Sequence, residues 1–281
     1  MRFAKYHGIG NDFVLLSDPD DRVELSARLV RALCDRRFGI GADGVIRVAP
    51  ASDGAELAMD YRNSDGSIGE MCGNGIRCLA VFAREQGLTD SSDLKVATGA
   101  GLKLVQVLDD GRVRVDMGAP VFDPPHIPFA WDQRDALRAR IDVGGTNVEL
   151  ACLSMGNPHA IIFSDDIATA PVATMGPLIE NHRAFPKGAN VEYARVVSAR
   201  QIEMRVWERG SGETLACGTG ACAATVAARL LAGTDPRVTV ALPGGELEVA
   251  WGGTLEAEAP VFMTGPVAKV FDGEVDLRAY A

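Results

Sequence analysis

Two cysteines stand in matching surroundings in this sequence. Residues 70–78 read EMCGNGIRC and residues 213–222 read ETLACGTGAC, so Cys72 and Cys217 are each followed by glycine, a small polar residue and glycine. A helix-forming stretch comes next in both places. The unpaired N–H groups at a helix N-terminus carry partial positive charge, so they bind carboxylates and stabilise a thiolate. Each motif therefore predicts an anion-binding turn with a reactive thiol.

One such motif alone also fits an inert buried cysteine, but a matched pair indicates a symmetrical site. We expect the two thiols to flank one carbon atom next to a bound carboxylate. One thiolate would remove the α-proton from one face, and the opposite thiol would return a proton to the other face. The helix ends would stabilise the charge that develops on the carboxylate. Such a site inverts a stereocentre without a redox cofactor.

The elements that must position the two cysteines also occur twice. The segment from Met59 to Gly75 aligns without a gap with the segment from Met204 to Gly220, 145 positions later. Three further pairs follow the same order: Gly10-Asn11 with Gly156-Asn157, GAD at 41–43 with GAN at 188–190, and KLVQVLDDGRVRVDM with ELEVAWGGTLEAEA. Four matched features in one order predict two copies of one domain.

Local patterns predict the elements of each copy. Alternating apolar residues around Asp110-Gly111 predict a β-hairpin, and Gly252-Gly253 marks the corresponding turn in the second copy. Apolar helices are expected over 76–87 and 221–233, each ending at a glycine and each buried in its own domain. The proline-rich segment 118–129 is expected to be the linker between the two copies.

Charge and composition restrict the partners. The chain has 28 basic and 38 acidic residues, a formal charge of −10, which argues against a nucleic-acid partner because phosphate binding needs a basic face. A small anionic or zwitterionic substrate remains possible. Neither a signal peptide nor a membrane-spanning apolar stretch is evident, so we expect a cytoplasmic protein with its six cysteines as thiols.

The remaining cysteines do not predict a metal site. Cys78 and Cys222 lie inside the expected helices, and neither forms the C-x-x-C spacing of a zinc or redox motif with its neighbour. Histidine is also scarce, with four in the chain. We therefore expect no bound metal and no cofactor.

Taken in order, the motifs resemble the diaminopimelate epimerase family. The matching stretches cover nearly the whole chain: HGIGNDF, RRFGIGADG, YRNSDGS, EMCGNGIRC, MGNPH, GANVEY, VWERGSGET and ACGTGACA. The resemblance implies an α/β fold of the α+β type with two pseudo-symmetric domains, each a curved, mostly antiparallel sheet wrapped around a central helix. It implies an N-terminal domain of residues 1–118 plus 264–281, a C-terminal domain of residues 119–263, and an active site in the cleft between them.

The resemblance also implies an activity. The family interconverts LL- and meso-2,6-diaminopimelate, a step toward lysine and peptidoglycan, without pyridoxal phosphate or metal, and often forms dimers through the first domain. We therefore expect a homodimer here. The catalytic thiols would be Cys72, usually described as the proton donor, and Cys217, the acceptor, with the roles exchanged when the reaction reverses. His159 and Glu208 would tune the pKa values of the two thiols.

Further residues are expected to contact the substrate. The resemblance implies contacts from Asn11, Asn63, Gly73, Asn74, Asn157, Asn190, Glu208, Arg209, Gly218 and Thr219. This set suits a substrate with an amino-acid group at each end, because Arg209 could grip a carboxylate in a bidentate pair and Glu208 could receive an ammonium group. Where some relatives have glutamine, this chain has Gly44, so only a backbone contact is expected there.

Each of these polar residues also has a plainer interpretation when taken alone. His159 could be a structural histidine that holds a loop. Glu208 and Arg209 could form a solvated pair at the end of a strand. Asn11 and Asn157 could be turn residues that follow glycine.

Two alternatives use the same cysteines. Proline racemases and hydroxyproline epimerases share the two-thiol scheme, but their substrates have one carboxylate and a ring nitrogen, which the many polar residues here do not favour. A thiol redox protein could cycle a Cys72–Cys217 disulfide if the sulfur geometry permitted it. The related phenazine-biosynthesis isomerases lack the cysteine pair, which argues against them.

Overall fold

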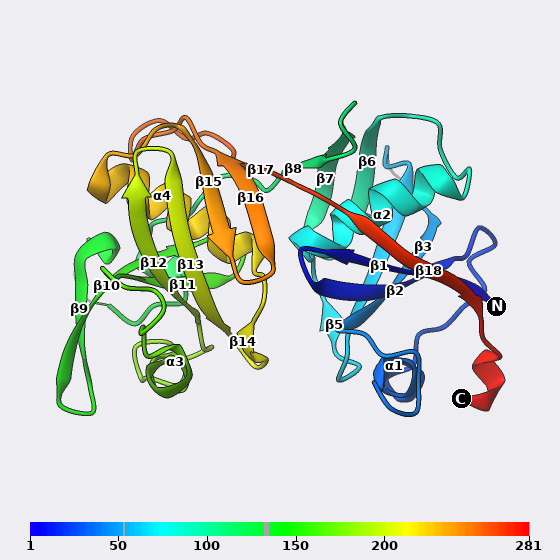
Figure 1. Ribbon diagram of the computed structural model, residues 1–281, viewed down its shortest axis with the longest axis horizontal. Coiled ribbons are helices and arrows are strands. Elements are labelled where there is room, and N and C mark those ends of the chain that lie inside the picture. Colours follow the sequence, from blue (N-terminus) through cyan, green and yellow to red (C-terminus); the bar gives the residue numbers. More distant parts are fainter. Residues whose placement is uncertain (53, 132–134, 281) are drawn as a thin grey trace. The chain divides into compact units, whose positions relative to one another are not determined.

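A computed structural model describes residues 1–52, 54–131 and 135–280. The chain divides into two compact units, each described by itself below and coloured by sequence in Figure 1. Unit 1 comprises Met1–Asp116 and Thr264–Ala281, and unit 2 comprises Met117–Met263.

Unit 1 is a curved sheet with two α-helices. Its elements are β1 (Arg2–Gly8), β2 (Asn11–Ser17), α1 (Ala27–Cys34), β3 (Gly44–Pro50), β4 (Leu57–Asn63), β5 (Ile68–Gly69), α2 (Gly73–Glu85), β6 (Asp93–Thr98), β7 (Gly101–Val107), β8 (Val113–Asp116), β18 (Ala268–Glu274) and the 3₁₀ turn η3 (Leu277–Ala279). The pairs β2–β3 and β4–β6 are parallel, and the pairs β18–β1, β1–β2, β3–β4, β4–β5, β6–β7 and β7–β8 are antiparallel.

Unit 2 repeats this order. After the 3₁₀ turns η1 (Pro124–His126) and η2 (Ala136–Arg138) come β9 (Ala139–Val143), β10 (Thr146–Ser154), β11 (Pro158–Phe163), α3 (Val172–Glu180), β12 (Asn190–Ser198), β13 (Gln201–Glu208), β14 (Gly212–Thr214), α4 (Gly218–Ala232), β15 (Arg237–Leu242), β16 (Gly245–Ala250) and β17 (Phe262–Gly265), which runs across the boundary. The pairs β11–β12 and β13–β15 are parallel, like their counterparts in unit 1, and the other pairs are antiparallel. The predicted duplication is confirmed.

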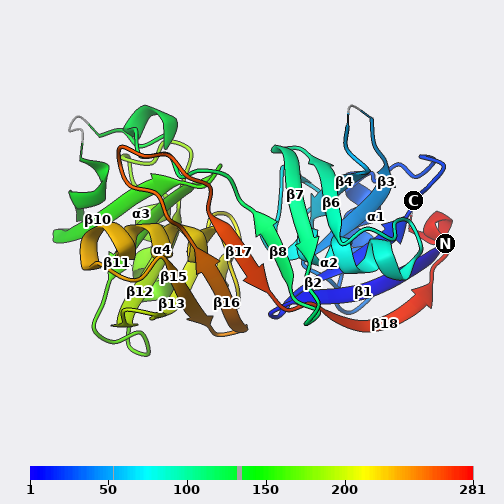
Figure 2. The ribbon, with the colours of Figure 1, turned by 90° about the horizontal axis from the view of Figure 1, so that it is seen from above.

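One helix lies inside the sheet of each unit. In unit 1, α2 contacts β1, β2, β3, β7 and β8, and in unit 2, α4 contacts β10, β11, β12, β13, β15 and β16; Figures 1 and 2 show each helix against its own strands. Small and apolar residues fill α4 from Gly218 to Ala228, and all of these except Thr219 are buried, so strands can approach this part of the helix from every side. The predicted fold, two curved and mostly antiparallel sheets around central helices, is confirmed.

The hairpin predicted at Asp110-Gly111 is confirmed, because β7 and β8 pair across that turn with Val105 opposite Val115. The matching hairpin at Gly252-Gly253 is wrong. β16 ends at Ala250, and the chain then folds back over the buried indole of Trp251, whose Nε1 donates to the Ala259 carbonyl at 3.1 Å. A side chain at Gly253 would touch that indole, so the glycine permits close packing instead of a strand turn.

The segment 118–129 is not a linker. All of it belongs to unit 2, where Ile127 and Phe129 lie in the hydrophobic core and Phe129 stacks on Phe185 with the ring centroids 4.9 Å apart. Val121 forms a β-bridge with Ser154. The prolines indicated a break in regular structure, but the apolar residues between them are buried in the unit that follows.

Candidate active site

Cys72 begins α2 as its N-cap. Its backbone is extended, with φ −131° and ψ 118°, and its sulfur accepts a hydrogen bond from the Gly75 N–H at 3.4 Å. A Cβ atom at Gly75 would lie 2.8 Å from Ile46 and 3.2 Å from Met59, so glycine is needed for the first helical turn to pack on β3 and β4. The predicted cysteine at a helix mouth is confirmed here, although the helix begins at Gly73, three residues before the expected start.

Asn11 and Asn74 lie beside this sulfur. The Asn11 Oδ1 accepts from the Cys72 thiol at 3.6 Å and from the Asn74 Nδ2 at 3.2 Å. The Asn11 Nδ2 donates to the Asp43 carboxylate at 2.7 Å, which fixes the orientation of the amide. The amide oxygen of Asn11 thus faces the S–H of Cys72, while the Gly75 N–H donates to the same sulfur.

Charged groups behind Asn11 are paired. Lys5 Nζ lies 2.8 Å from Asp12, and Arg36 binds Asp12 at 2.7 Å and Asp43 at 2.8 Å. Burial opposes ionisation of Asp12, but hydrogen bonds from Arg36 and Lys5 outweigh it and lower the pKa of that carboxyl to about 2. The two carboxylates of this network are thus matched by two fixed cations.

Asn63 ends β4, and the next residue, Ser64, donates its N–H to the Asp43 carbonyl at 3.0 Å. The Asn63 Oδ1 accepts from the Tyr61 hydroxyl at 2.7 Å and its Nδ2 donates to the Ser67 hydroxyl at 3.0 Å. It pairs across the strands with Gly44, where a Cβ would lie 2.6 Å from the Arg62 carbonyl and 2.7 Å from the Tyr61 ring. In the surroundings of this chain, position 44 has no room for a side chain.

Cys217 begins α4 in the same way. It is the N-cap, with φ −119° and ψ 110°, and its sulfur accepts from the Gly220 N–H at 3.4 Å. Gly233, with φ 69°, ends the helix as expected. Unlike Cys72, which is partly exposed, Cys217 is only 4% exposed. The two cysteines therefore share one backbone geometry but differ in their access to solvent.

A chain of polar side chains leads away from Cys217. Its sulfur lies 3.5 Å from the Thr219 hydroxyl, which accepts from the Asn157 Nδ2 at 3.3 Å. The Asn157 Oδ1 lies 2.9 Å from the Nε2 of His159, and the Nδ1 of His159 lies 2.7 Å from Glu192. The structure thus brings three of the expected residues of unit 2 to Cys217, together with one residue that was not expected.

Glu208 also acts on Cys217. Its carboxylate accepts from the Thr214 hydroxyl and is hydrogen-bonded with Cys217. Burial raises the pKa of Glu208, and these hydrogen bonds oppose that shift. Burial, followed by the negative charges of Glu208 and Glu192, raises the pKa of the Cys217 thiol well above its usual range. Without a ligand, Cys217 therefore holds its proton.

Asn190 and Arg209 form a separate contact in unit 2. The Asn190 Nδ2 donates to the Pro158 carbonyl at 3.2 Å, and its Oδ1 accepts from the Arg209 N–H at 2.9 Å. The exposed guanidinium of Arg209 donates to the Lys187 carbonyl at 3.2 Å. Within the residues that the structure describes, one backbone oxygen binds this guanidinium, so other donors are left for a ligand.

Sequence reasoning missed Glu192, which is fully buried. The sequence feature that could have indicated it is NVEYA, the first part of β12, in which the residues on both sides of the glutamate are buried. A lone carboxylate in such a strand is costly unless it is paired. The same reasoning missed Asp43, although it lies in the GAD segment that had been matched with GAN.

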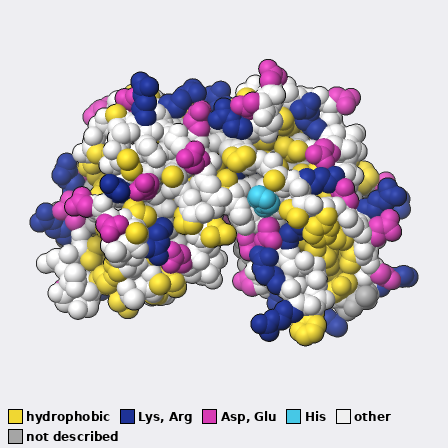
Figure 3. All heavy atoms as spheres, in the orientation of Figure 1, with side chains coloured by type: hydrophobic (Ala, Val, Ile, Leu, Met, Phe, Trp, Pro, Cys, Tyr) yellow, Lys and Arg dark blue, Asp and Glu magenta, His cyan; other side chains and the backbone are white. Residues whose placement is uncertain are grey.

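No group of three or more histidine, cysteine, aspartate or glutamate side chains that could hold a metal ion occurs in 1–52, 54–131 and 135–280. Within the same residues, no helix is both long enough and apolar enough to span a membrane. On the face in view, acidic and basic side chains are mixed and do not form one large basic patch (Figure 3).

Solved structures define the class of fold. A hydroxyproline epimerase from Agrobacterium vitis superposes with a TM-score of 0.69 at 16% identity, covering 97% of this chain and 91% of that one. A PhzF-family phenazine biosynthesis protein from Bacillus anthracis superposes with a TM-score of 0.68 at 18% identity, covering 98% of each chain. The chain thus has the two-domain α/β fold of these proteins.

The family is shown by closer relatives. The chain belongs to the diaminopimelate epimerase family, whose model matches residues 3–122 and 151–270. The diaminopimelate epimerase of Thioalkalivibrio sulfidiphilus is 49% identical over 280 residues, 99% of each chain. That of Moorella thermoacetica is 47% identical over 283 residues, covering 99% of this chain and all of the relative. These relatives do not favour the racemase and redox alternatives.

Proposed function

We propose that this chain is an isomerase that interconverts LL- and meso-2,6-diaminopimelate by passing an α-proton between Cys72 and Cys217. Family membership supports the substrate. The observation that carries the mechanism is the duplicated N-cap, because each unit has one cysteine at the start of its central helix. In both units the sulfur lies 3.4 Å from the backbone nitrogen three residues later, that of Gly75 or Gly220. The product would serve lysine and peptidoglycan synthesis.

The reaction moves protons and no other atoms. One sulfur, as thiolate, takes the α-proton and becomes a thiol. The electron pair left on the α-carbon spreads into the neighbouring carboxylate, and the opposite thiol then protonates the other face and becomes a thiolate. The electron sink is the substrate's own carboxylate, so the proposed reaction needs neither pyridoxal phosphate nor a metal.

The helix N-termini would bind the reacting carboxylate. The first N–H groups of a helix have no partner within the helix, and here they belong to Gly73, Asn74, Gly218 and Thr219. These groups point at developing negative charge and are fixed before the reaction, which is the arrangement that stabilises an enolate-like transition state. Asn11 would contact the same end of the substrate through its amide.

The distal end of diaminopimelate would be held by the remaining polar residues. Arg209 suits the distal carboxylate, because its planar guanidinium can form two parallel hydrogen bonds. Asn63, Asn157 and Asn190 each offer a donor and an acceptor to the substrate's ammonium and carboxylate groups. Glu208 would receive an ammonium group.

Substrate charge would activate Cys217. In the unliganded protein, burial and two nearby carboxylates raise the pKa of this thiol. An ammonium group next to Glu208 would offset that negative charge and favour the thiolate. In this scheme His159 and Glu208 tune the thiol, and the thiolate forms when a substrate of the right charge is bound.

The mechanism requires both cysteines to face the same α-carbon. We therefore propose that the substrate binds in a cleft between the two domains, and that closure excludes water, which would otherwise protonate the carbanion on either face. The six cysteines are free thiols, which supports a reducing cytoplasmic location.

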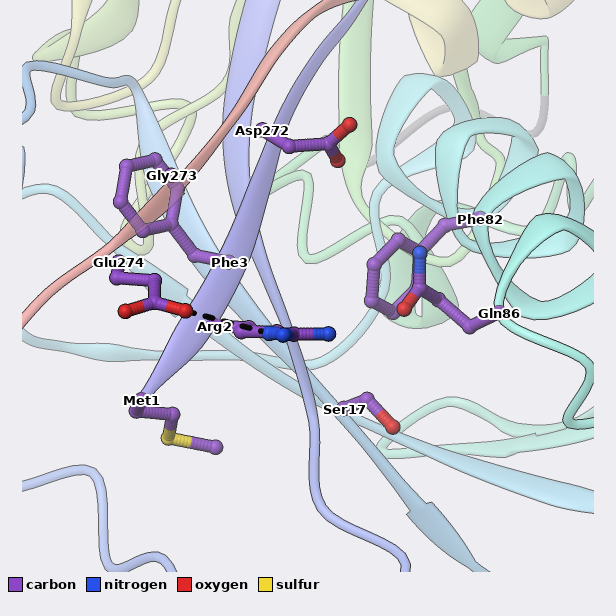
Figure 4. Close-up of a pocket in the computed structure, with 9 residues that line it drawn as sticks. All are labelled: Met1, Arg2, Phe3, Ser17, Phe82, Gln86, Asp272, Gly273 and Glu274. Carbon is purple, nitrogen blue, oxygen red and sulfur yellow. Dashed lines mark hydrogen bonds and ion pairs between the residues drawn. The ribbon is translucent and has the colours of Figure 1, made fainter.

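We further propose that the protein is a homodimer formed through unit 1. Six of the seven residues of β18 are exposed, including Val270 (54%) and Phe271 (45%). Beside this strand lies a hollow of about 640 Å³, lined by residues of β1, β18 and α2, and Phe3 and Phe82 are among them (Figure 4). Exposed apolar surface of this kind is typical of an interface.

Sedimentation analysis should give the mass of a dimer, and Phe271→Lys should give a monomer.

Proton NMR in deuterated water tests the activity. Reduced protein with LL-diaminopimelate should lose the α-proton signal and form the meso isomer. If no exchange occurs, the proposed substrate is wrong, and proline and hydroxyproline would be assayed under the same conditions. If activity appears only when the thiols are oxidised, the two-thiol mechanism is wrong.

A further inference from the structure

A buried carboxylate with no assigned role lies beneath the N-terminus of α4. Glu192 and His159 are both fully buried, and the Glu192 Oε1 lies 2.7 Å from the His159 Nδ1. A Cβ at Gly220 would lie 2.7 Å from the same oxygen, so the helix passes directly over the carboxylate. The other oxygen is buried with no hydrogen-bond partner in the part of the chain that the structure describes. Such a group is expensive to keep buried, which calls for a function.

The ring of His159 connects this carboxylate to the proposed active site. Its Nε2 lies 2.9 Å from the Asn157 Oδ1, and the Asn157 Nδ2 donates to the Thr219 hydroxyl at 3.3 Å. That hydroxyl lies 3.5 Å from the Cys217 sulfur. Glu192 is therefore joined to the sulfur by an unbroken series of hydrogen bonds, all within unit 2.

The chemistry of each partner fixes the direction of the bonds. An ionised carboxylate only accepts, so the His159 Nδ1 must carry a proton. The Asn157 Oδ1 also only accepts, so in the orientation of the structure it pairs with His159 only when Nε2 bears a proton. The Asn157 amide then uses its N–H on Thr219, which leaves the hydroxyl proton free to point at the Cys217 sulfur.

A neutral ring would reverse the order. Its Nε2 would accept, so the Asn157 amide would have to turn over and present its oxygen to Thr219. The hydroxyl proton would then point at the amide and no longer at the sulfur. The protonation and orientation of His159 thus decide whether the thiolate of Cys217 has the Thr219 hydroxyl as a second donor, beside the Gly220 N–H.

We propose that Glu192 is a positioning residue for Cys217, acting through the ring of His159. It keeps the proton on Nδ1 and holds the ring in the orientation that directs the Thr219 hydroxyl toward the sulfur. It does not touch the substrate. This inference rests on the proposed role of Cys217 as one of the two bases.

Several titratable groups face Glu192 and enter any pH dependence. They come from four elements: Cys152 on β10, His159 on β11, Glu208 on β13 and Cys217 before α4. The Glu192 charge contributes to the raised pKa of Cys217, after burial and Glu208. Removing the charge should therefore lower the pKa of this thiol. A neutral amide at position 192 would also hold the Nδ1 proton less firmly than a carboxylate, which should slow the reaction.

The test is the pH profile of Glu192→Gln beside wild type. We expect kcat to fall about tenfold with KM changed by less than about twofold, and the limb of the profile due to Cys217 to move about one pH unit lower. Glu192→Asp keeps the charge, so the limb should stay near its wild-type position while kcat remains low. Glu203→Gln is the control, because Glu203 is an exposed carboxylate of unit 2 paired with Arg195. A kcat that stays at the wild-type value in both Glu192→Gln and Glu192→Asp overturns the proposal, because the ring would then be positioned without the glutamate.

A second measurement is independent of activity. Long-range ¹H–¹⁵N NMR of the wild-type chain labelled at its four histidines reports the protons on each ring. His159 should show a protonated Nδ1 that is protected from exchange, and Glu192→Gln or Glu192→Asp should weaken that protection. An unprotonated Nδ1 in wild type overturns the inference even if epimerase activity is found, and a protonated Nδ1 supports it even if the proposed substrate proves wrong.

Discussion

The two cysteines have the same backbone setting and opposite surroundings. Cys72 is partly exposed and faces the amide of Asn11. That amide donates to Asp43, whose carboxylate is paired with Arg36. Cys217 is almost fully buried, and the negative charges of Glu208 and Glu192 act on it. The duplicated frame supplied two equal helix ends, and the side chains around them then diverged in charge.

This difference indicates how each half would respond to a ligand. The carboxylates near Cys72 are already neutralised by Lys5 and Arg36. Those near Cys217 lack such a lysine or arginine pair among the ion pairs of the described residues, so an incoming ammonium group would change that half more. The helix of unit 1 also carries a buried cation, Arg77, one turn from Cys72, where unit 2 has the neutral Cys222.

The strongest test of this pairing is removal of either thiol. Cys72→Ala and Cys217→Ala should each lower kcat for epimerisation by about a thousandfold, because each removes the acid or base for one face. Steady-state assays in both directions would measure this. Near-normal turnover in one variant would mean that the two halves are not partners in one reaction. Cys78→Ala, in the same helix as Cys72, is the matched control and should keep its activity.

Unfolding at low pH should test the carboxylate network of unit 1, which contains Asp12. The pKa of Asp12 is lowered from 3.8 to about 2, so its ionisation stabilises the folded protein above the unfolded value and this contribution is lost as the pH falls through the folded value. Asp12→Asn should lower the free energy of unfolding by about 2 kcal/mol at pH 7 and by much less at pH 2. Urea unfolding at both pH values would show this. An equal loss at pH 7 and pH 2 would mean that the charge of Asp12 is not what stabilises unit 1.

Thiol reactivity should report the difference in exposure. In substrate-free protein at neutral pH, iodoacetamide should modify Cys72 about tenfold faster than Cys217, because burial restricts access to Cys217 and raises the pKa of its thiol. Mass spectrometry of the two peptides gives both rates in one sample. The fully buried Cys78 and Cys222 serve as internal controls. Equal rates would contradict the contrast between an open and a closed half.

The smallest expected effect concerns Glu208. After burial, the negative charge of Glu208 is the largest cause of the raised pKa of Cys217. Glu208→Gln should therefore move the Cys217 limb of the pH profile downward, by about half a pH unit, in addition to weakening substrate binding. A shift upward would show that Glu208 is protonated in the working enzyme and acts as a hydrogen-bond donor.

The sequence was most informative where local rules decide the structure. The cysteine caps, the helix end at Gly233 and the hairpin at Asp110-Gly111 each depend on a few adjacent residues, and all were predicted. The order of the elements followed from the repeat. Contacts such as that of Asn157 with Thr219, 62 positions apart, were expected only in the sense that both residues belonged to one site.

The sequence was least informative where the role of a residue depends on its burial by segments that are distant in the chain. Glu192 looks like any strand glutamate until His159 on the neighbouring strand and α4 above it are in place. The segment around Phe129 looked like a linker because prolines interrupt it, but its aromatic ring packs in a core formed by strands that come later in the chain. The space at Gly44 likewise depends on Tyr61, on the adjacent strand.

The return of the chain to unit 1 has a consequence for synthesis. β1 lies between β2 and β18, and the Met1 amino group hydrogen-bonds to the Val275 carbonyl at 2.6 Å. On the ribosome, unit 2 has all of its residues once Met263 has emerged, whereas unit 1 still lacks a strand. Unit 1 is therefore translated first but completed last, and the edge of β1 that pairs with β18 stays unpaired while unit 2 is synthesised.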